Sequence, residues 1–130
     1  MKKKQFYFVR HGQSEFNAGG VRQGPEGRLS EEGIRQVKLS AQKFLDLSVE
    51  GILSSPYTRA QETASIIASA IGKEVEYSDL LIERKNPSEI VGKAADDPDV
   101  LKITDRIDKG FHMDELRYSD EENFQDLKGR

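Results

Sequence analysis

Three short strand-like runs separated by two amphipathic stretches constrain the fold of this chain more than any other feature. The runs occupy residues 6–9, 51–54 and 74–77; the first two are mainly apolar, and the third alternates charged and apolar residues. Between them, residues 30–47 and 55–72 carry apolar side chains at the three- and four-residue spacing of a helix. The order strand, helix, strand, helix, strand is typical of a parallel α/β sheet.

Local signals set the expected helix ends. Ser30 is a suitable N-cap, and we expect the first helix to run to about Leu47. For the second helix, Ser55 is the predicted N-cap, Pro56 takes the first helical position, and Gly72 ends the helix. The residues predicted to be buried are Phe6, Phe8, Ile34, Val37, Ala41, Phe44, Leu45, Ala60, Ala64, Ile67 and Ile71. Shorter helices are expected near residues 87–89, 99–107 and 120–128.

Length and charge narrow the class of protein. The 130 residues favour one domain spanning 1–130. The formal net charge of −3 lacks the basic excess of a general nucleic-acid binder, so any anion site must be a local cluster of positive groups. There is no cysteine, which excludes thiolate chemistry, and no apolar stretch long enough to span a membrane. A cytoplasmic protein without membrane or nucleic-acid partners is therefore expected.

The first run ends in residues that can take part in catalysis, Arg10-His11-Gly12. Ligands of open α/β sheets bind at the carboxyl ends of the strands. A histidine there can act as a nucleophile when one ring N–H donates a hydrogen bond, often to a backbone carbonyl, and the other ring nitrogen is left neutral. Arg10 offers paired donors for phosphate oxygens, and Gly12 allows a ligand or another backbone to approach closely.

A second motif, Ser54–Thr63, begins at another strand end and continues into a helix. Arg59 is predicted to lie in the first turn of that helix. Unpaired backbone N–H groups, the helix dipole and a guanidinium would then act together on a bound phosphate.

Three segments together resemble the histidine phosphatase superfamily, also called the phosphoglycerate mutase-like family. Phe8–Asn17 is similar to its first signature, Ser54–Thr63 to its second, and Leu81–Arg84 to the segment that supplies its acid. The resemblance extends over essentially the whole chain and is looser after Gly92. It implies a three-layer α/β/α fold with a mostly parallel sheet, incomplete at its C-terminal side in this chain.

The resemblance also implies a phosphomonoester hydrolase that works through a phosphohistidine. Transferred to matching positions, His11 is the nucleophile, Arg10 and Arg59 hold the phosphoryl oxygens, and Glu83 protonates the leaving oxygen and later helps to activate water. Glu89 is a nearby substitute for the acid.

Two further positions, Asn17 and Gly24, match family residues that contact phosphate or substrate. The expected partner is a small phosphorylated substrate or a phosphoprotein. No metal and no cofactor are expected, because the arginines supply the positive charge.

One element of the family pattern is missing. The family has a second histidine after a late aliphatic strand, but the other histidine of this chain, His112, follows no such strand and precedes no glycine. We therefore expect the chain to stop before that strand. A phosphate pocket short of one donor and an uncovered sheet edge beside residues 6–9, open to homo-oligomer formation, would follow.

Two alternative functions remain at this point. One is phosphoglycerate mutase-type phosphoryl transfer, although residues 83–89 lack the glycine-rich continuation of the glycolytic mutases. The other is a non-catalytic module that binds a phosphate ligand.

Overall fold

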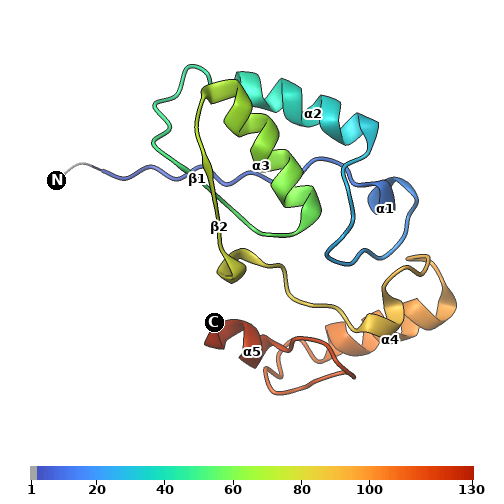
Figure 1. The fold of residues 1–130 in the computed structure, drawn as a ribbon. Helices are drawn as coiled ribbons and strands as arrows, with labels where there is room; N and C mark the ends of the chain where they lie inside the picture. The colour runs from blue at the N-terminus through green and yellow to red at the C-terminus, as the bar shows by residue number, and fades with distance from the viewer. Residues whose placement is uncertain (1–2) are drawn as a thin grey trace.

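The computed structural model describes residues 3–130 and shows a mixed α/β fold with a parallel sheet (Figure 1). Strands β1 (Ile52–Ser54) and β2 (Val75–Tyr77) pair in parallel, with Ile52 opposite Val75. Helix α3 (Thr58–Ile71) connects them, as parallel strands require a crossover. The predicted α/β class and the second and third predicted strands are therefore confirmed.

Helix α2 (Glu31–Gln42) packs beside α3 and forms the main core with it. The Ser30 hydroxyl accepts a hydrogen bond of 3.0 Å from the N–H of Gly33, which is the predicted N-cap interaction. The core consists of Leu29, Val37, Ala41 and Ile67, with Ile34, Phe44, Ile52, Ile66 and Ile71 packed against it.

The first long helix ends earlier than predicted. Beyond Gln42, residues 43–47 form turns whose backbone hydrogen bonds reach back only three residues, for example from the N–H of Phe44 to the carbonyl of Ala41. The tighter turns rotate Leu45 away from the core, and its side chain is 52% exposed rather than buried.

The second long helix begins later than predicted. Tyr57 occupies the N-cap position, and the hydroxyl of Ser55 accepts a hydrogen bond of 3.2 Å from the N–H of Tyr57 instead of capping the helix itself. At the other end, Gly72 ends the helix as predicted, with the left-handed φ of 67° that glycine adopts readily.

The predicted first strand is wrong. Residues 6–9 are extended but form no strand, and Phe6 and Phe8 are 75% and 98% exposed rather than buried. A strand exists only where a neighbouring backbone offers a hydrogen-bonding ladder, and no backbone within residues 3–130 pairs with this segment. The ring of Tyr7 packs edge-on against Phe44, at 6.1 Å between centroids.

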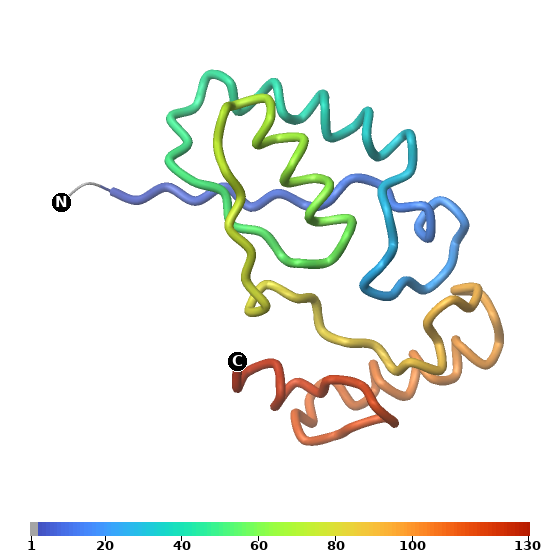
Figure 2. The backbone as a smooth tube through the Cα atoms, in the orientation of Figure 1, coloured from blue at the N-terminus to red at the C-terminus, as the bar shows by residue number. Residues whose placement is uncertain are grey.

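The C-terminal part of the chain, from residue 88 onward, forms a second group of helices (Figure 2). Its buried residues include Ile90 and Val100, both 0% exposed. An isolated antiparallel bridge between Val21 and Ala94 ties the loop after the first signature to this group. The elements not yet given are α1 (Glu15–Ala18), η1 (Asp79–Leu81), η2 (Ser88–Ile90), α4 (Pro98–Lys109) and α5 (Phe124–Gly129).

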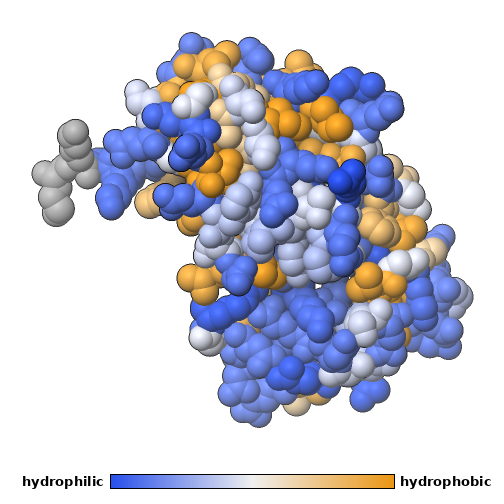
Figure 3. Space-filling model, in the orientation of Figure 1, coloured by the Kyte–Doolittle hydropathy of each residue, from blue (hydrophilic) through white to orange (hydrophobic). Residues whose placement is uncertain are grey.

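The two groups differ in surface character. Apolar surface gathers around α2 and α3, whereas the face formed by α4 and α5 is mostly hydrophilic (Figure 3). Among residues 3–130, no helix has the length and apolar character needed to cross a bilayer.

Candidate active site

The segment that carries His11 is joined to the start of α3 by a buried hydroxyl. The N–H of Gly12 donates to Oγ1 of Thr63 at 3.2 Å, and the same hydroxyl donates to the carbonyl of Arg59 at 2.8 Å. Both bonds are buried. They bring the first and second signatures together although 51 residues separate Gly12 from Thr63.

Two glycines allow this segment to pass directly over α2. A Cβ added to Gly12 would lie 2.6 Å from the carbonyl oxygen of Gly33, and one added to Gly33 would lie 2.0 Å from the carbonyl oxygen of Gln13. Both distances are far below van der Waals contact. The close approach that Gly12 permits is therefore that of another backbone, as one of the two sequence-based interpretations expected.

The imidazole of His11 is held in one tautomer by its own neighbour. Its Nδ1 lies 2.7 Å from the carbonyl oxygen of Gly12. A carbonyl can only accept a hydrogen bond, so Nδ1 carries the proton and Nε2 of the neutral ring keeps a free electron pair. The side chain is 12% exposed, so the ring is largely shielded.

Arg59 is a buried cation on the first turn of α3, with 1% of the residue exposed. Its Nη1 donates to the carbonyl of Gly24 at 2.8 Å, and its Nη2 donates to Oε2 of Glu83 at 3.0 Å. Within residues 3–130 its Nε has no hydrogen-bond partner. This Nε atom is itself buried, as is the Nε of Arg22, so both are polar atoms enclosed in the fold without a partner among these residues.

The carboxylate of Glu83 connects the arginine and the histidine. One oxygen bonds Arg59, and the other lies 3.7 Å from Nε2 of His11. The side chain is 58% exposed, so only these two groups and the backbone hold it in place. A carboxylate, an imidazole and a guanidinium thus lie together, while their roles as acid, nucleophile and phosphate ligand stay predictions.

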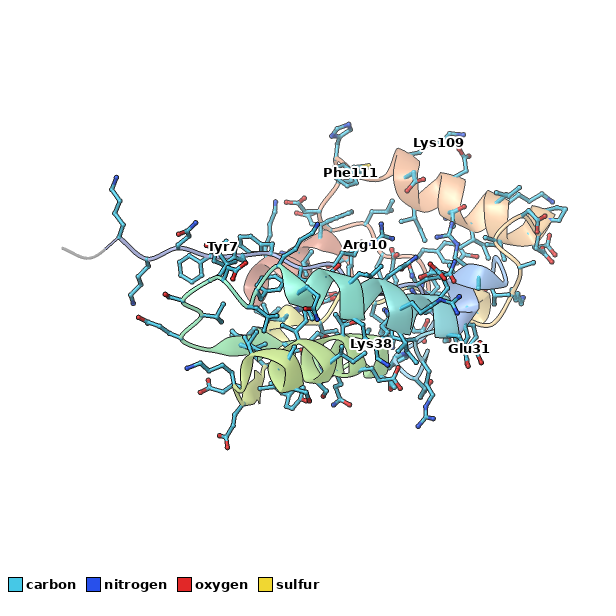
Figure 4. All side chains as sticks on the ribbon, turned by 90° about the horizontal axis from the view of Figure 1, so that it is seen from above. Tyr7, Arg10, Glu31, Lys38, Lys109 and Phe111 are labelled. Carbon is cyan, nitrogen blue, oxygen red and sulfur yellow. The ribbon has the colours of Figure 1, made fainter. Side chains whose placement is uncertain are left out.

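Of the other predicted contacts, Arg10 and Asn17 form no bond with this cluster among residues 3–130. Arg10 is exposed and, within residues 3–130, forms no hydrogen bond or ion pair; with His11 it lines a small cavity of about 120 Å³ against α2 and α3 (Figure 4). Asn17 is exposed on α1, and its N–H donates to the hydroxyl of Ser14. Gly24 does take part, through the carbonyl that Arg59 bonds.

The residues considered as substitutes lie elsewhere. Glu89 is exposed on η2. His112 is exposed after α4, with its ring packed edge-on against Phe111 at 5.8 Å between centroids.

Sequence reasoning missed the role of Thr63. Its position four residues after Arg59 places both side chains on one face of α3, which was a usable signal. It also missed the ion pair at the residue after Glu83, in which Arg84 bonds the buried Glu121 at 3.1 Å. No sequence signal links residues 37 positions apart in this way.

An aromatic ring borders the guanidinium. The Cζ of Arg59 lies 5.1 Å from the centroid of the Tyr57 ring. Burial raises the pKa of the Tyr57 phenol, while the charge of Arg59 opposes the rise. The phenol therefore stays neutral at physiological pH and adds no charge to the site.

Comparisons with known proteins agree with this geometry. The family model described as histidine phosphatase superfamily (branch 1) matches residues 6–130. A protein of Photorhabdus laumondii named "Probable phosphoglycerate mutase GpmB" is 35% identical over 125 residues, which cover 86% of this chain and 57% of that protein. A protein of Hydrogenobacter thermophilus named "Putative phosphoserine phosphatase 2" is 40% identical over 81 residues, 62% of this chain and 40% of that protein. The chain thus spans little more than half of the first relative's length and less of the second's.

Solved structures give the same fold. A mycobacterial glucosyl-3-phosphoglycerate phosphatase in complex with VO3 superposes with a TM-score of 0.74 at 25% identity, covering 92% of this chain and 56% of that one. The α-ribazole-5′-P phosphatase structure from Escherichia coli, titled as putative, has a TM-score of 0.75 at 21% identity, with coverages of 93% and 60%.

Proposed function

Since the chain belongs to branch 1 of the histidine phosphatase superfamily, we propose that it hydrolyses small phosphomonoesters through a phosphohistidine formed on His11. The observation that carries the proposal is the state of the His11 ring: Nδ1 is tied to the carbonyl of Gly12, and Nε2 lies 3.7 Å from Glu83. A neutral imidazole with its free electron pair facing an acid and a buried guanidinium is arranged for attack on phosphorus.

In the first step, Nε2 of His11 attacks the phosphorus in line with the leaving oxygen. The N–P bond forms as the P–O bond to the leaving group breaks, and the leaving oxygen takes a proton from the carboxyl of Glu83. The buried guanidinium of Arg59 neutralises the charge on the equatorial oxygens. Its contact with Glu83, which also lies 3.7 Å from Nε2 of His11, supports this role.

In the second step, water attacks the phosphohistidine. The carboxylate of Glu83 takes a proton from the water, the N–P bond breaks, and inorganic phosphate leaves. The ring of His11 returns to the tautomer that the Gly12 carbonyl favours. Arg10, Asn17 and Gly24 are proposed as further phosphate or substrate contacts, of which Gly24 acts through the orientation of Arg59.

Trapping the phosphoenzyme tests the proposal. The chain is incubated with a ³²P-labelled phosphomonoester and quenched with base, because phosphohistidine survives base and is lost in acid. Wild type and His112→Gln should carry base-stable, acid-labile label, and His11→Ala should carry none. Label that persists in His11→Ala, or its absence from the wild type, would contradict the proposed nucleophile.

A mutase remains the second candidate, favoured by the name of the 35% identical relative. A mutase would return the phosphoryl group to a second hydroxyl and would need a bisphosphorylated primer. Release of inorganic phosphate without any primer supports hydrolysis, and turnover that depends on the primer supports the mutase.

A phosphate-binding module without turnover is the third candidate. The chain covers 57% of the first relative's length, so catalysis by these residues alone is a proposal and does not follow from the similarity. Binding of inorganic phosphate by a chain that never forms the phosphoenzyme would select this candidate. The substrate class proposed here is a small phosphorylated molecule, and the cytoplasmic location expected from the sequence stays a prediction.

A further inference from the structure

The acid of the proposed site is held from behind by a second, separate set of contacts. Glu83 is 58% exposed, and within residues 3–130 the polar contacts of its side chain are those with His11 and Arg59. A long, exposed side chain with two ionic contacts has many other rotamers available in water. What keeps Glu83 near His11 must therefore act on its backbone.

The residue after Glu83 supplies the first contact. Nη1 of Arg84 donates to Oε2 of Glu121 at 3.1 Å and to the carbonyl of Glu122 at 3.2 Å. Its guanidinium also lies 4.7 Å from the centroid of the Phe124 ring. Side chains of adjacent residues thus turn to different partners, Glu83 to the active site and Arg84 to the C-terminal segment.

Glu121 is a buried carboxylate. Its side chain is 3% exposed, and its second oxygen accepts a hydrogen bond of 2.8 Å from the N–H of Tyr118. Both oxygens are therefore engaged, and neither faces the active site. A charge is retained at this depth only when it is paired, so the Arg84 contact is the condition for burying it.

Backbone contacts on both sides of Glu83 complete the arrangement. The N–H of Lys85 donates to the carboxylate of Glu122 at 3.1 Å, and the N–H of Glu122 donates to the carbonyl of Lys85 at 3.0 Å. On the other side, Arg130 donates to the carbonyl of Ile82. Hydrogen bonds therefore hold the backbone on both the N-terminal and the C-terminal side of Glu83.

We propose that Glu121, through its buried ion pair with Arg84, is a positioning residue that holds the Glu83 carboxylate against His11 and Arg59. The proposal rests on the function proposed for Glu83, and it adds residues 120–122, which touch neither the nucleophile nor the guanidinium. Loss of the Glu121 charge removes the ionic partner of Arg84, which keeps its bond to the carbonyl of Glu122, and so weakens one of the attachments of the backbone around Glu83.

The kinetic test separates positioning from general damage by the leaving group. An alkyl phosphate needs a proton on its leaving oxygen, whereas 2,4-dinitrophenyl phosphate leaves without one. Displacing the acid by about 1 Å costs on the order of a hundredfold or less in rate. Glu121→Gln should therefore lower kcat/KM on the order of tenfold to a hundredfold for glycerol phosphate and leave that for the dinitrophenyl ester nearly unchanged. Equal losses on both esters would overturn the proposal.

Three further variants guard against simple misfolding. Arg84→Lys keeps a cation beside Glu121 and should recover much of the rate that Arg84→Met loses. Asp105→Asn removes an exposed ion pair with Lys109 on α4 and serves as the matched control, with no effect on either ester. An Arg84→Lys variant as impaired as Arg84→Met would also contradict the proposal.

A spectroscopic measurement decides the matter independently of turnover. The chain has two histidines, so His112→Gln assigns the ring resonances of His11. Glu83→Gln should shift those resonances, and Glu121→Gln should shift them in the same direction, whereas Asp105→Asn should not. Unchanged His11 resonances in Glu121→Gln would overturn the positioning role, even if the chain proves to be an active phosphatase. Absence of turnover in the wild type would instead count against the proposed function alone.

Discussion

The carbonyl oxygen of Gly24 accepts a hydrogen bond of 2.8 Å from the buried guanidinium of Arg59. This bond fixes one end of the guanidinium on the backbone, while the other end donates to Glu83. An ammonium group is a point charge and cannot satisfy both directions at once.

Arg59→Lys therefore tests hydrogen bonding by the guanidinium in two directions and not only its positive charge. We expect kcat/KM for a phosphomonoester to fall by about 10²–10³, the range found when one oxyanion donor is removed. Steady-state kinetics measure the effect. Arg28→Lys is the control, because its side chain is 72% exposed. Near-normal activity of Arg59→Lys would argue that charge alone suffices.

The buried hydroxyl of Thr63 is expected to contribute to stability. Thr63→Val leaves the N–H of Gly12 buried without its partner, which costs about 1–3 kcal/mol. Urea denaturation measures the change in the free energy of unfolding. Thr104→Val is a close control, since the Thr104 hydroxyl bonds only carbonyls of its own helix at 3.0 and 3.1 Å. Equal losses in the free energy of unfolding from both substitutions would contradict a special role of Thr63.

The approach of two backbones at Gly33 leaves no space for a methyl group. In Gly33→Ala the new Cβ would lie 2.0 Å from the carbonyl oxygen of Gln13, so the first signature must move away from α2. Overpacking of this kind costs about 1–3 kcal/mol. Thermal unfolding should show the loss, whereas Gly51→Ala, where nothing lies within 4 Å, should not.

Local signals predicted a large part of this structure. Gly72 ends α3, Ser30 caps α2, and Arg59 lies in the first turn of its helix, because each depends on a few neighbouring residues. The first predicted strand failed because pairing depends on a distant backbone, and nothing in residues 6–9 reveals whether a partner is present.

The site was predicted unevenly for the same reason. The convergence of His11, Arg59 and Glu83 was expected from the resemblance of three segments to the histidine phosphatase superfamily. Arg10 was expected in that cluster, yet no bond within residues 3–130 joins it there, and its role stays a prediction. The Arg84–Glu121 pair has no sequence signature, since burial of both charges arises only after the chain is folded.

Acid should loosen the C-terminal segment before the core. The hydrogen bond from Arg130 lowers the pKa of Glu122, and that from the backbone of Asn123 lowers the pKa of Asp126. A carboxylate with a depressed folded pKa stabilises the fold above its unfolded value and loses this contribution as the pH falls through the folded value. The unfolded values are near 4.5 and 3.8, so the loss occurs below pH 4.5.

Hydrogen exchange, corrected for intrinsic rates, measures this effect. Protection of α5 should fall between pH 6 and pH 3, while that of α3 stays high because its core is apolar. Simultaneous loss of protection in both helices would show instead that the fold is one cooperative unit.

The exposed segment of residues 6–9 favours self-association. Phe8 is 98% exposed, and within residues 3–130 no backbone hydrogen bond covers this segment. Extended, apolar and unpaired backbone is a template for another chain. Sedimentation should show concentration-dependent association that Phe8→Lys reduces. Leu39→Lys, a 73% exposed position on α2, is the control and should leave association unchanged.

The contacts that orient His11 and those that hold Arg59 span different distances along the sequence. The carbonyl that selects the His11 tautomer belongs to the next residue, whereas Arg59 is held by residues 35 and 24 positions away. A partly unfolded molecule would thus keep the His11 tautomer but lose the contacts that hold Arg59 beside it. Conditions that loosen the fold without unfolding it should slow phosphoryl transfer while the histidine stays as reactive toward small electrophiles as before.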